Sequence, residues 1–291
     1  MISAPRIAAA PISWGVIEVP DWGVQLPPDR VLREMVELGV QATEFGPEGF
    51  LPAEPVERAR VLDDVGLTAV GGFFPTVLHD RDADPLPAIE RELEAYVAAE
   101  AGVLVLSAIT GAAGYEQKPQ LGDDEWDTLI ANLDRALVAA ERVGVVATLH
   151  PHLGTVVEAP AEVRRVVDRS RIGFCLDTGH LTIGGGDPLA FVEAHADRVT
   201  HVHLKDVSSA IADRVQSGEI SYREGVRQGM YRPLGAGDAR VAEIIAALRR
   251  VGYAGWYVLE QDTVLESEAD AARALADARI GVELIRREVG R

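Results

Sequence analysis

The sequence predicts an α/β protein folded as a single (β/α)8 TIM barrel. Short apolar runs rich in Val, Ile and Leu recur at fairly even spacing along the 291 residues, and the segments between them have helical period and length. The apolar runs lack polar alternation, which is typical of parallel strands covered on both faces. One barrel needs roughly 250 residues, so the length fits. An open doubly wound sheet is the alternative, but no Gly-x-Gly-x-x-Gly follows the first strand.

The expected elements alternate from the N-terminus onward. Strands are predicted near 7–14, 41–46, 67–74, 103–109, 145–150, 172–177, 199–205 and 256–261. Helices are predicted near 28–38, 55–65, 85–101, 123–143, 160–169, 188–196, 239–251 and 267–288. We take 1–291 as one domain with a long insertion near 207–236, here called the inserted segment. A long connection at the active face of a barrel is usually a lid or an interface arm.

Composition narrows the classes of partner. Lys and Arg number 28 and Asp and Glu 46, which gives a formal net charge of −18. Such an acidic surface argues against nucleic acid or an anionic membrane as partner. The single cysteine, Cys175, excludes a disulfide within the chain and is interpreted as a small buried hydrophobe. No secretion signal or membrane-length apolar run is evident, so we expect a cytoplasmic protein; a homo-oligomer stays open.

Metal-binding residue types stand at the ends of the last four predicted strands. They are His150, Asp177, His203 and Glu260. In a closed barrel these strand ends converge on one side of the mouth, so the four side chains are expected to meet around one divalent ion. Mixed nitrogen and oxygen ligands suit Mn²⁺ or Co²⁺, with Mg²⁺ or Zn²⁺ as alternatives. Taken singly, Asp177 is also a candidate helix cap and Glu260 a candidate partner for an arginine.

Two further histidines follow the same strand ends. His152 shares a side with His150 in an extended strand, so it is either the first ligand in place of His150 or a proton-transfer group. His180 lies one helical turn after Asp177 and is expected to contact substrate, although a structural role is equally compatible.

Lys205 and His201 flank His203 at two-residue spacing. Both therefore share its side of the strand. A cation near Lys205 disfavours the ammonium form, and the lysine is expected to donate a proton to a leaving hydroxyl or to stabilise an enolate. A salt bridge to Asp206 or Glu260 is the alternative. His201 is expected to pack behind the metal as a supporting partner. The expected catalytic residues are thus Lys205, Glu260 and His152.

The first half of the chain supplies candidates for substrate binding. Trp14 ends the first predicted strand, Glu44 ends the second and His79 follows the third. Aromatic faces cover C–H groups and carboxylates hold hydroxyls, so these residues suit a polyol. Trp14, Glu44, His79 and His180 are the expected substrate-binding residues. Trp14 and Phe74 fit the top layer of the core equally well.

Several strings resemble those of a known superfamily over nearly the whole chain. The chain is similar to the xylose isomerase-like TIM-barrel superfamily, the sugar phosphate isomerases and epimerases, and most similar to its inosose dehydratase branch. Asp-Thr-Gly-His and His-x-His-x-Lys-Asp are specific to the superfamily. The strings at 10–16 and 42–52 point to the inosose dehydratase branch. The strings lie at 10–16, 42–52, 150–155, 177–180 and 201–206.

The resemblance implies an activity and a ligand set. The superfamily's epimerases hold a metal with Glu, Asp, His and Glu; Asp177, His203 and Glu260 match the last three, and His150 replaces the first. The replacement disfavours plain 3-epimerase chemistry. It favours metal-dependent dehydration of a keto-inositol (inosose), or a related keto-polyol, through an enediolate, which is an activity of inositol catabolism. Isomerisation or epimerisation of a keto sugar is the alternative; an abasic-site endonuclease or a non-catalytic barrel subunit are alternatives of other classes.

Overall fold

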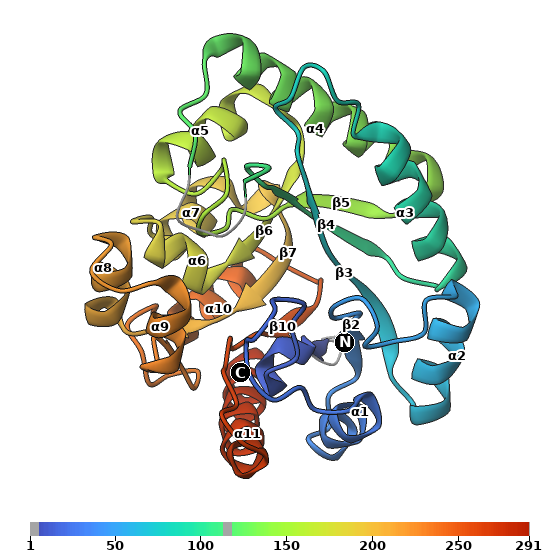
Figure 1. The fold of residues 1–291 in the computed structure, drawn as a ribbon, viewed down its shortest axis with the longest axis vertical. Coiled ribbons are helices and arrows are strands. Elements are labelled where there is room, and N and C mark those ends of the chain that lie inside the picture. Colours follow the sequence, from blue (N-terminus) through green and yellow to red (C-terminus); the bar gives the residue numbers. More distant parts are fainter. Residues whose placement is uncertain (1–5, 113–117, 291) are drawn as a thin grey trace.

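A closed barrel of parallel strands forms the centre of the molecule (Figure 1). The computed structural model describes residues 6–112 and 118–290. Within them the barrel strands are hydrogen-bonded in the order β1-β10-β7-β6-β5-β4-β3-β2, which confirms the predicted fold class. Residues 1–5, where the sequence predicts no secretion signal, lie outside the described residues. No helix in the described ranges is long and apolar enough to cross a membrane.

The barrel strands match the predicted apolar runs and are mostly shorter. They are β1 (Ile7–Ala9), β2 (Ala42–Glu44), β3 (Thr68–Thr76), β4 (Val103–Ala108), β5 (Val146–Leu149), β6 (Gly173–Asp177), β7 (Val199–Leu204) and β10 (Tyr257–Leu259). Their apolar side chains, apart from the strand-end groups described below, are largely buried, as the absence of polar alternation indicated.

The surrounding helices follow the strands along the chain. They are α1 (Pro28–Glu37), α2 (Pro55–Val65), α3 (Leu86–Ala98), α4 (Asp123–Val143), α5 (Pro160–Arg169), α7 (Pro188–His195), α10 (Val241–Arg250) and α11 (Ala271–Val289). Proline stands at the first or second position of α1, α2, α5 and α7, where its missing N–H has no intrahelical partner to lose. A further short helix, α6 (Thr178–Ile183), follows β6 directly.

The first strand ends earlier than the sequence predicts. A 3-10 helix, η1 (Pro11–Trp14), takes the place of its second half. Pro11 starts this turn, and the turn directs Trp14 away from the barrel mouth toward α1. Short 3-10 helices also precede β7 (η2, Ala196–Arg198) and α11 (η3, Glu268–Asp270).

The inserted segment folds into small elements instead of a structureless loop. It contains α8 (Ser209–Gln216), α9 (Tyr222–Arg227) and an antiparallel pair of strands, β8 (Asp206–Val207) and β9 (Tyr231–Arg232). In Figure 1, α8 and α9 lie together beside α6 at one edge of the molecule.

Asp206 fastens both ends of the inserted segment to the barrel. Its Oδ2 accepts hydrogen bonds from the amides of Gly235 (2.8 Å) and Gly237 (3.1 Å), and its Oδ1 accepts one from Ala239 (3.0 Å). Position 237 must be glycine, because a Cβ there would lie 2.5 Å from Asp206 Oδ1. The buried carboxylate therefore joins the exit from β7 to the turn that leads into α10.

Candidate functional site

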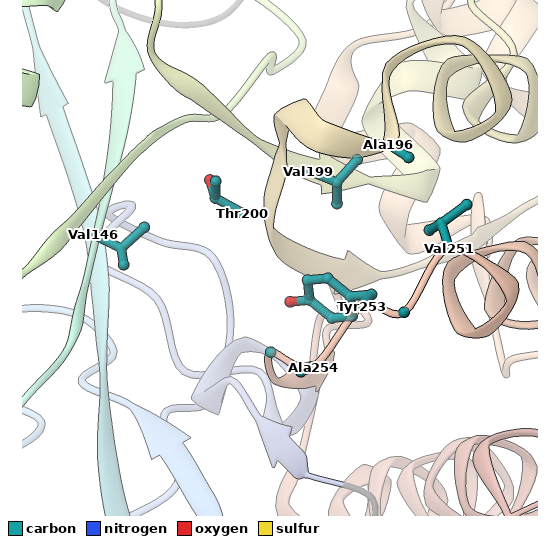
Figure 2. A pocket seen from close by; sticks show the side chains of 9 residues that line it. Val146, Ala196, Val199, Thr200, Val251, Tyr253 and Ala254 are labelled. Atoms are coloured by element: carbon teal, nitrogen blue, oxygen red, sulfur yellow. The ribbon is translucent and has the colours of Figure 1, made fainter.

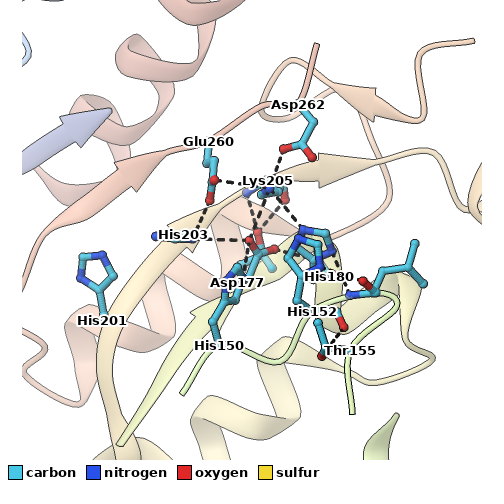
Figure 3. Close-up of polar contacts among 12 residues, drawn as sticks. His150, His152, Thr155, Asp177, His180, His201, His203, Lys205, Glu260 and Asp262 are labelled. Carbon is cyan, nitrogen blue, oxygen red and sulfur yellow. Dashed lines mark hydrogen bonds and ion pairs between the residues drawn. The ribbon is translucent and has the colours of Figure 1, made fainter. Parts of the chain in front are cut away.

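A cluster of ionisable side chains lies at the carboxyl ends of β5, β6, β7 and β10 (Figure 3). Parallel pairing places Asp177 beside His203, and Val258 also pairs with His203. Because side chains alternate along a strand, Glu260, two residues beyond Val258, faces the same side as His203. The barrel topology thus brings together residues far apart in the sequence, as predicted.

Asp177, His203 and Glu260 form the centre of this cluster. One ligand atom from each lies within 4.8 Å of those of the other two. His203 Nδ1 is 2.5 Å from Glu260 Oε2 and 3.7 Å from Asp177 Oδ2. The side chains of His203 and Asp177 are almost completely buried, and that of Glu260 is 14% exposed toward the cavity.

The chemistry of this trio fits a divalent cation. His203 Nε2 faces the Glu44 carboxylate, which only accepts hydrogen bonds, so Nε2 carries a proton. In the neutral ring, the lone pair of Nδ1 therefore points at Glu260. Nδ1 and Glu260 Oε2 are both buried without a hydrogen bond of acceptable geometry, although they lie 2.5 Å apart. A lone pair and a carboxylate at that distance need a proton or a cation between them.

His203 takes the proton when no cation is bound. Burial opposes its charge, but Cys175, Glu260 and Glu44 outweigh burial and raise the pKa of His203 well above its usual value. Since burial also raises the pKa of Cys175 to about 12, the thiol is neutral near pH 7 and the two carboxylates dominate. A metal ion would displace this proton, as metals do at histidine ligands.

His150 borders the trio without joining it. Its Nε2 lies 3.3 Å from Asp177 Oδ2, and its ligand atom groups with those of Asp177 and His180. Of the two histidines that follow β5, His150 is therefore the one whose ring meets Asp177.

Glu44 accepts hydrogen bonds from His203 and its neighbour His201. Its Oε1 lies 2.9 Å from His201 Nε2 and 2.8 Å from His203 Nε2, so one carboxylate oxygen accepts from both imidazoles. Burial would raise the pKa of Glu44, but His203 and His201 hold it well below the usual range. A carboxylate behind a ligating histidine fixes the ring and its tautomer. This contact assigns Glu44 a positioning role in addition to its place in the cavity wall.

Lys205 lies among carboxylates. Its Nζ is 2.5 Å from Asp262 Oδ1, 3.6 Å from Glu260 Oε1 and 3.8 Å from Asp177 Oδ2. Burial disfavours its charge, but these three groups outweigh burial and raise the pKa of Lys205 well above its usual value. The expectation that a nearby cation disfavours the ammonium stays a prediction; without a cation, the three carboxylates stabilise the charge. The alternative was a salt bridge to Asp206 or Glu260; the ion pair with Glu260 is present, whereas Asp206 holds backbone amides instead.

His152 and His180 stack behind Lys205. Their ring centroids are 3.7 Å apart, and His180 Nε2 lies 3.3 Å from Lys205 Nζ. His152 Nδ1 donates to the carbonyl of Leu153 (2.8 Å), and burial with the charges of His150 and Lys205 lowers the pKa of His152 to about 3. Asp177 also caps α6, because its Oδ1 accepts the amide hydrogen of His180 (2.7 Å).

A cavity of about 580 Å³ opens above this cluster. Lys205, Glu260, His150 and His152 line one side. Aromatic side chains from the first half of the barrel form another part of the wall; they are Phe45, Phe73, Phe74 and Tyr96. The Phe73 ring is 39% exposed and lies 5.9 Å from the rings of both His150 and His152. A carbohydrate ring thus has a flat apolar face beside the polar cluster.

Three predicted substrate-binding residues, Trp14, His79 and His180, do not line this cavity, and His180 is buried beside Lys205. Trp14 is fully buried, and its indole N–H donates to Glu34 (2.8 Å). Trp14 belongs to the core, because η1 replaces the end of the predicted strand. His79 is buried beyond the end of β3, outside the cavity wall.

Sequence reasoning missed Asp262 and Tyr222. Asp262 Oδ2 accepts a hydrogen bond from Tyr222 Oη (2.6 Å), and both residues line the cavity. The spacing of Asp262 from Glu260 was the available signal, since residues two apart share a side of an extended chain. Tyr222 gave no such signal, because it enters from the inserted segment.

A second cavity, of about 350 Å³, lies at the opposite end of the barrel (Figure 2). Val146 and Val199, at the starts of β5 and β7, line it together with Thr200 and Tyr253. Its described lining contains no carboxylate, imidazole or amine. Conserved chemistry in TIM barrels sits at the carboxyl end of the strands, so this cavity is a feature of packing.

The fold and the cluster place the chain among the TIM-barrel enzymes. A sequence profile of the xylose isomerase-like TIM barrel family matches residues 32–283, and the chain therefore belongs to this family. The rhizopine catabolism protein MocC of Rhizobium meliloti is 31% identical, over 97% of this chain and 88% of its own. The inosose dehydratase of Geobacillus kaustophilus (strain HTA426) is 31% identical, over 98% of this chain and 94% of its own. The predicted relation to inosose dehydratase is thereby confirmed.

Solved structures agree on the fold. L-ribulose 3-epimerase superposes with a TM-score of 0.70 at 17% identity, covering 98% of this chain and 95% of its own. The IolI protein with a binding zinc atom superposes with a TM-score of 0.68 at 14% identity, covering 97% and 98%. The prediction that the chain is an enzyme related to inosose dehydratase is confirmed by the family match and by the relative of that name.

Proposed function

We propose that this enzyme dehydrates a keto-inositol, or a closely related cyclic keto-polyol, through an enediolate. The observation that carries the proposal is that Asp177, His203 and Glu260 meet beside the Lys205 ammonium, and that Glu260 and Lys205 line one cavity. The relatives named inosose dehydratase support the same reaction.

Asp177, His203 and Glu260 would hold a divalent ion, with His150 next to Asp177. Mn²⁺ and Co²⁺ suit one imidazole nitrogen with carboxylate oxygens. Such an ion supplies Lewis acidity that favours loss of the proton beside a carbonyl. The chain's own contribution is to orient His203, through Glu44, toward Glu260 and Asp177.

The reaction needs one base and one acid. A base, His152 or Glu260, takes the proton next to the ketone. The Lys205 ammonium then donates a proton to the neighbouring hydroxyl, which leaves as water as the carbon–carbon double bond forms. Lys205 has a proton to donate because its carboxylate partners keep it protonated.

The cavity wall favours an uncharged substrate. Its carboxylates outnumber its cations, Lys205 and Arg58, and they include Glu18, Glu48 and Glu92. A phosphate group would meet repulsion there, whereas hydroxyls find acceptors. We therefore propose a neutral polyol as the substrate and the cytoplasm as the location of the enzyme.

The test is a substrate screen with Mn²⁺- or Co²⁺-loaded protein in D₂O. Scyllo-inosose should exchange its proton and give a new enone absorbance, and Lys205→Met should retain metal and lose the absorbance. Proton exchange with a ketohexose and no absorbance change would replace dehydration by epimerisation. No reaction with any inosose or ketose would refute the proposed function.

A further inference from the structure

Lys205 is linked to the inserted segment through Asp262. The ammonium lies 2.5 Å from Asp262 Oδ1, and the other oxygen of that carboxylate accepts the Tyr222 hydroxyl hydrogen at 2.6 Å. Tyr222 Oη is in turn 3.0 Å from Tyr231 Oη. Both tyrosines belong to the inserted segment, in α9 and β9.

The surroundings hold Tyr222 firmly. It is 4% exposed, and its ring centroid lies 6.2 Å from that of Trp22. Ser221 caps α9 by accepting the amide hydrogen of Glu224 (3.2 Å), so the helix that begins at Tyr222 has a defined start. The Tyr222 hydroxyl is therefore a fixed donor that sets the rotation of the Asp262 carboxylate.

Lys205 has competing partners that make this rotation matter. Glu260 and Asp177 lie 3.6 and 3.8 Å from its ammonium, and Figure 3 shows Lys205 between Glu260 and Asp262. Without an oriented Asp262 oxygen, the ammonium would move toward Glu260 and Asp177. It would then lie against the two carboxylates that are proposed to hold the cation.

We propose that Tyr222 is a positioning residue, which holds Lys205 at the cavity through Asp262 and keeps it away from Glu260 and Asp177. The inserted segment is then a part of the active site. Since Tyr222 also lines the cavity, the same segment shapes the space that a substrate occupies. This inference rests on the proposed function for the role of Lys205 and on the geometry alone for its position.

The test compares Tyr222→Phe with Tyr253→Phe in the full-length, metal-loaded protein. Both changes delete one phenol hydroxyl that donates a hydrogen bond, but Tyr253 donates to the carbonyl of Trp256 (2.9 Å) at the opposite end of the barrel. We expect Tyr222→Phe to lower kcat about 10- to 100-fold, the usual effect of displacing a catalytic group by about 1 Å. KM and Tm should change little, and Tyr253→Phe should keep the wild-type kcat.

A crystal structure of Tyr222→Phe provides a readout that needs no substrate. Movement of the Lys205 ammonium from Asp262 toward Glu260 supports the proposal. Lys205 in its wild-type place, or a kcat within about threefold of wild type, overturns it. If the wild type converts no inosose or ketose, the proposed function fails, and the position of Lys205 in the variant decides the present inference by itself.

Discussion

Replacing Glu44 by Gln tests whether the buried carboxylate prepares His203 for a metal. Glu44 Oε1 accepts hydrogen bonds from His203 at 2.8 Å and from His201 at 2.9 Å. The amide of Gln is nearly the same size, but it has no charge, and its NH₂ group cannot accept from an imidazole N–H. The His203 ring thus keeps its place while its Nδ1 becomes a weaker ligand.

The expected loss is 10- to 100-fold in affinity for Mn²⁺ or Co²⁺, the range for partners behind a metal ligand. That range equals about 1.4–2.8 kcal/mol of binding free energy. Isothermal titration of the metal-free protein measures it. The pKa of Glu44 lies well below its usual range, so the carboxylate is ionised in any titration near neutral pH and its contribution is lost only in strong acid.

Glu34→Gln is the matched control. Glu34 is also a buried carboxylate with two nitrogen partners, Trp14 Nε1 and Arg30 Nε, each within 2.9 Å, but it lies outside the cavity wall. The Glu34→Gln variant should be less stable than the wild type and should bind the metal with the wild-type affinity. Affinity within twofold of wild type in Glu44→Gln would show that this carboxylate does not tune the site.

Three further predictions follow from the structure. His203→Ala and Glu260→Ala should each abolish stoichiometric metal binding and activity, measured by metal analysis and turnover; full metal content in both would remove the site. Asp206→Ala should lower the free energy of unfolding by about 2–4 kcal/mol, because the buried Ala239 amide and two glycine amides lose their acceptor. A loss below about 1 kcal/mol in urea titration contradicts this. Burial raises the pKa of Cys175 to about 12, so at pH 8 iodoacetamide should modify the native thiol ~100-fold more slowly than the unfolded one; equal rates would refute its burial.

The sequence predicted the barrel well because its strands are continuous apolar runs between helices with clear ends. Helix α4 occupies the predicted 123–143, and α2 the predicted 55–65. The first strand was overextended, since hydrophobicity does not distinguish a strand from the buried 3-10 turn that Pro11 begins. That error moved Trp14 from the core to the cavity in the prediction.

The candidate site was predictable where the residues follow strand ends. Asp177, His203 and Glu260 could be grouped because parallel strands share one carboxyl-terminal edge. Tyr222 could not be found, because nothing in the spacing of the inserted segment tells which of its side chains turns inward. The placement of Glu44 beneath His203 depends on contact across the barrel interior, which sequence separation does not reveal.

Asp206 gathers the two ends of the inserted segment at one carboxylate. A stretch of chain that departs and returns at a common point can be lengthened, shortened or exchanged without shifting the strands beneath it. The shape of the cavity can therefore change through this segment while Asp177, His203 and Glu260 keep their places at the strand ends.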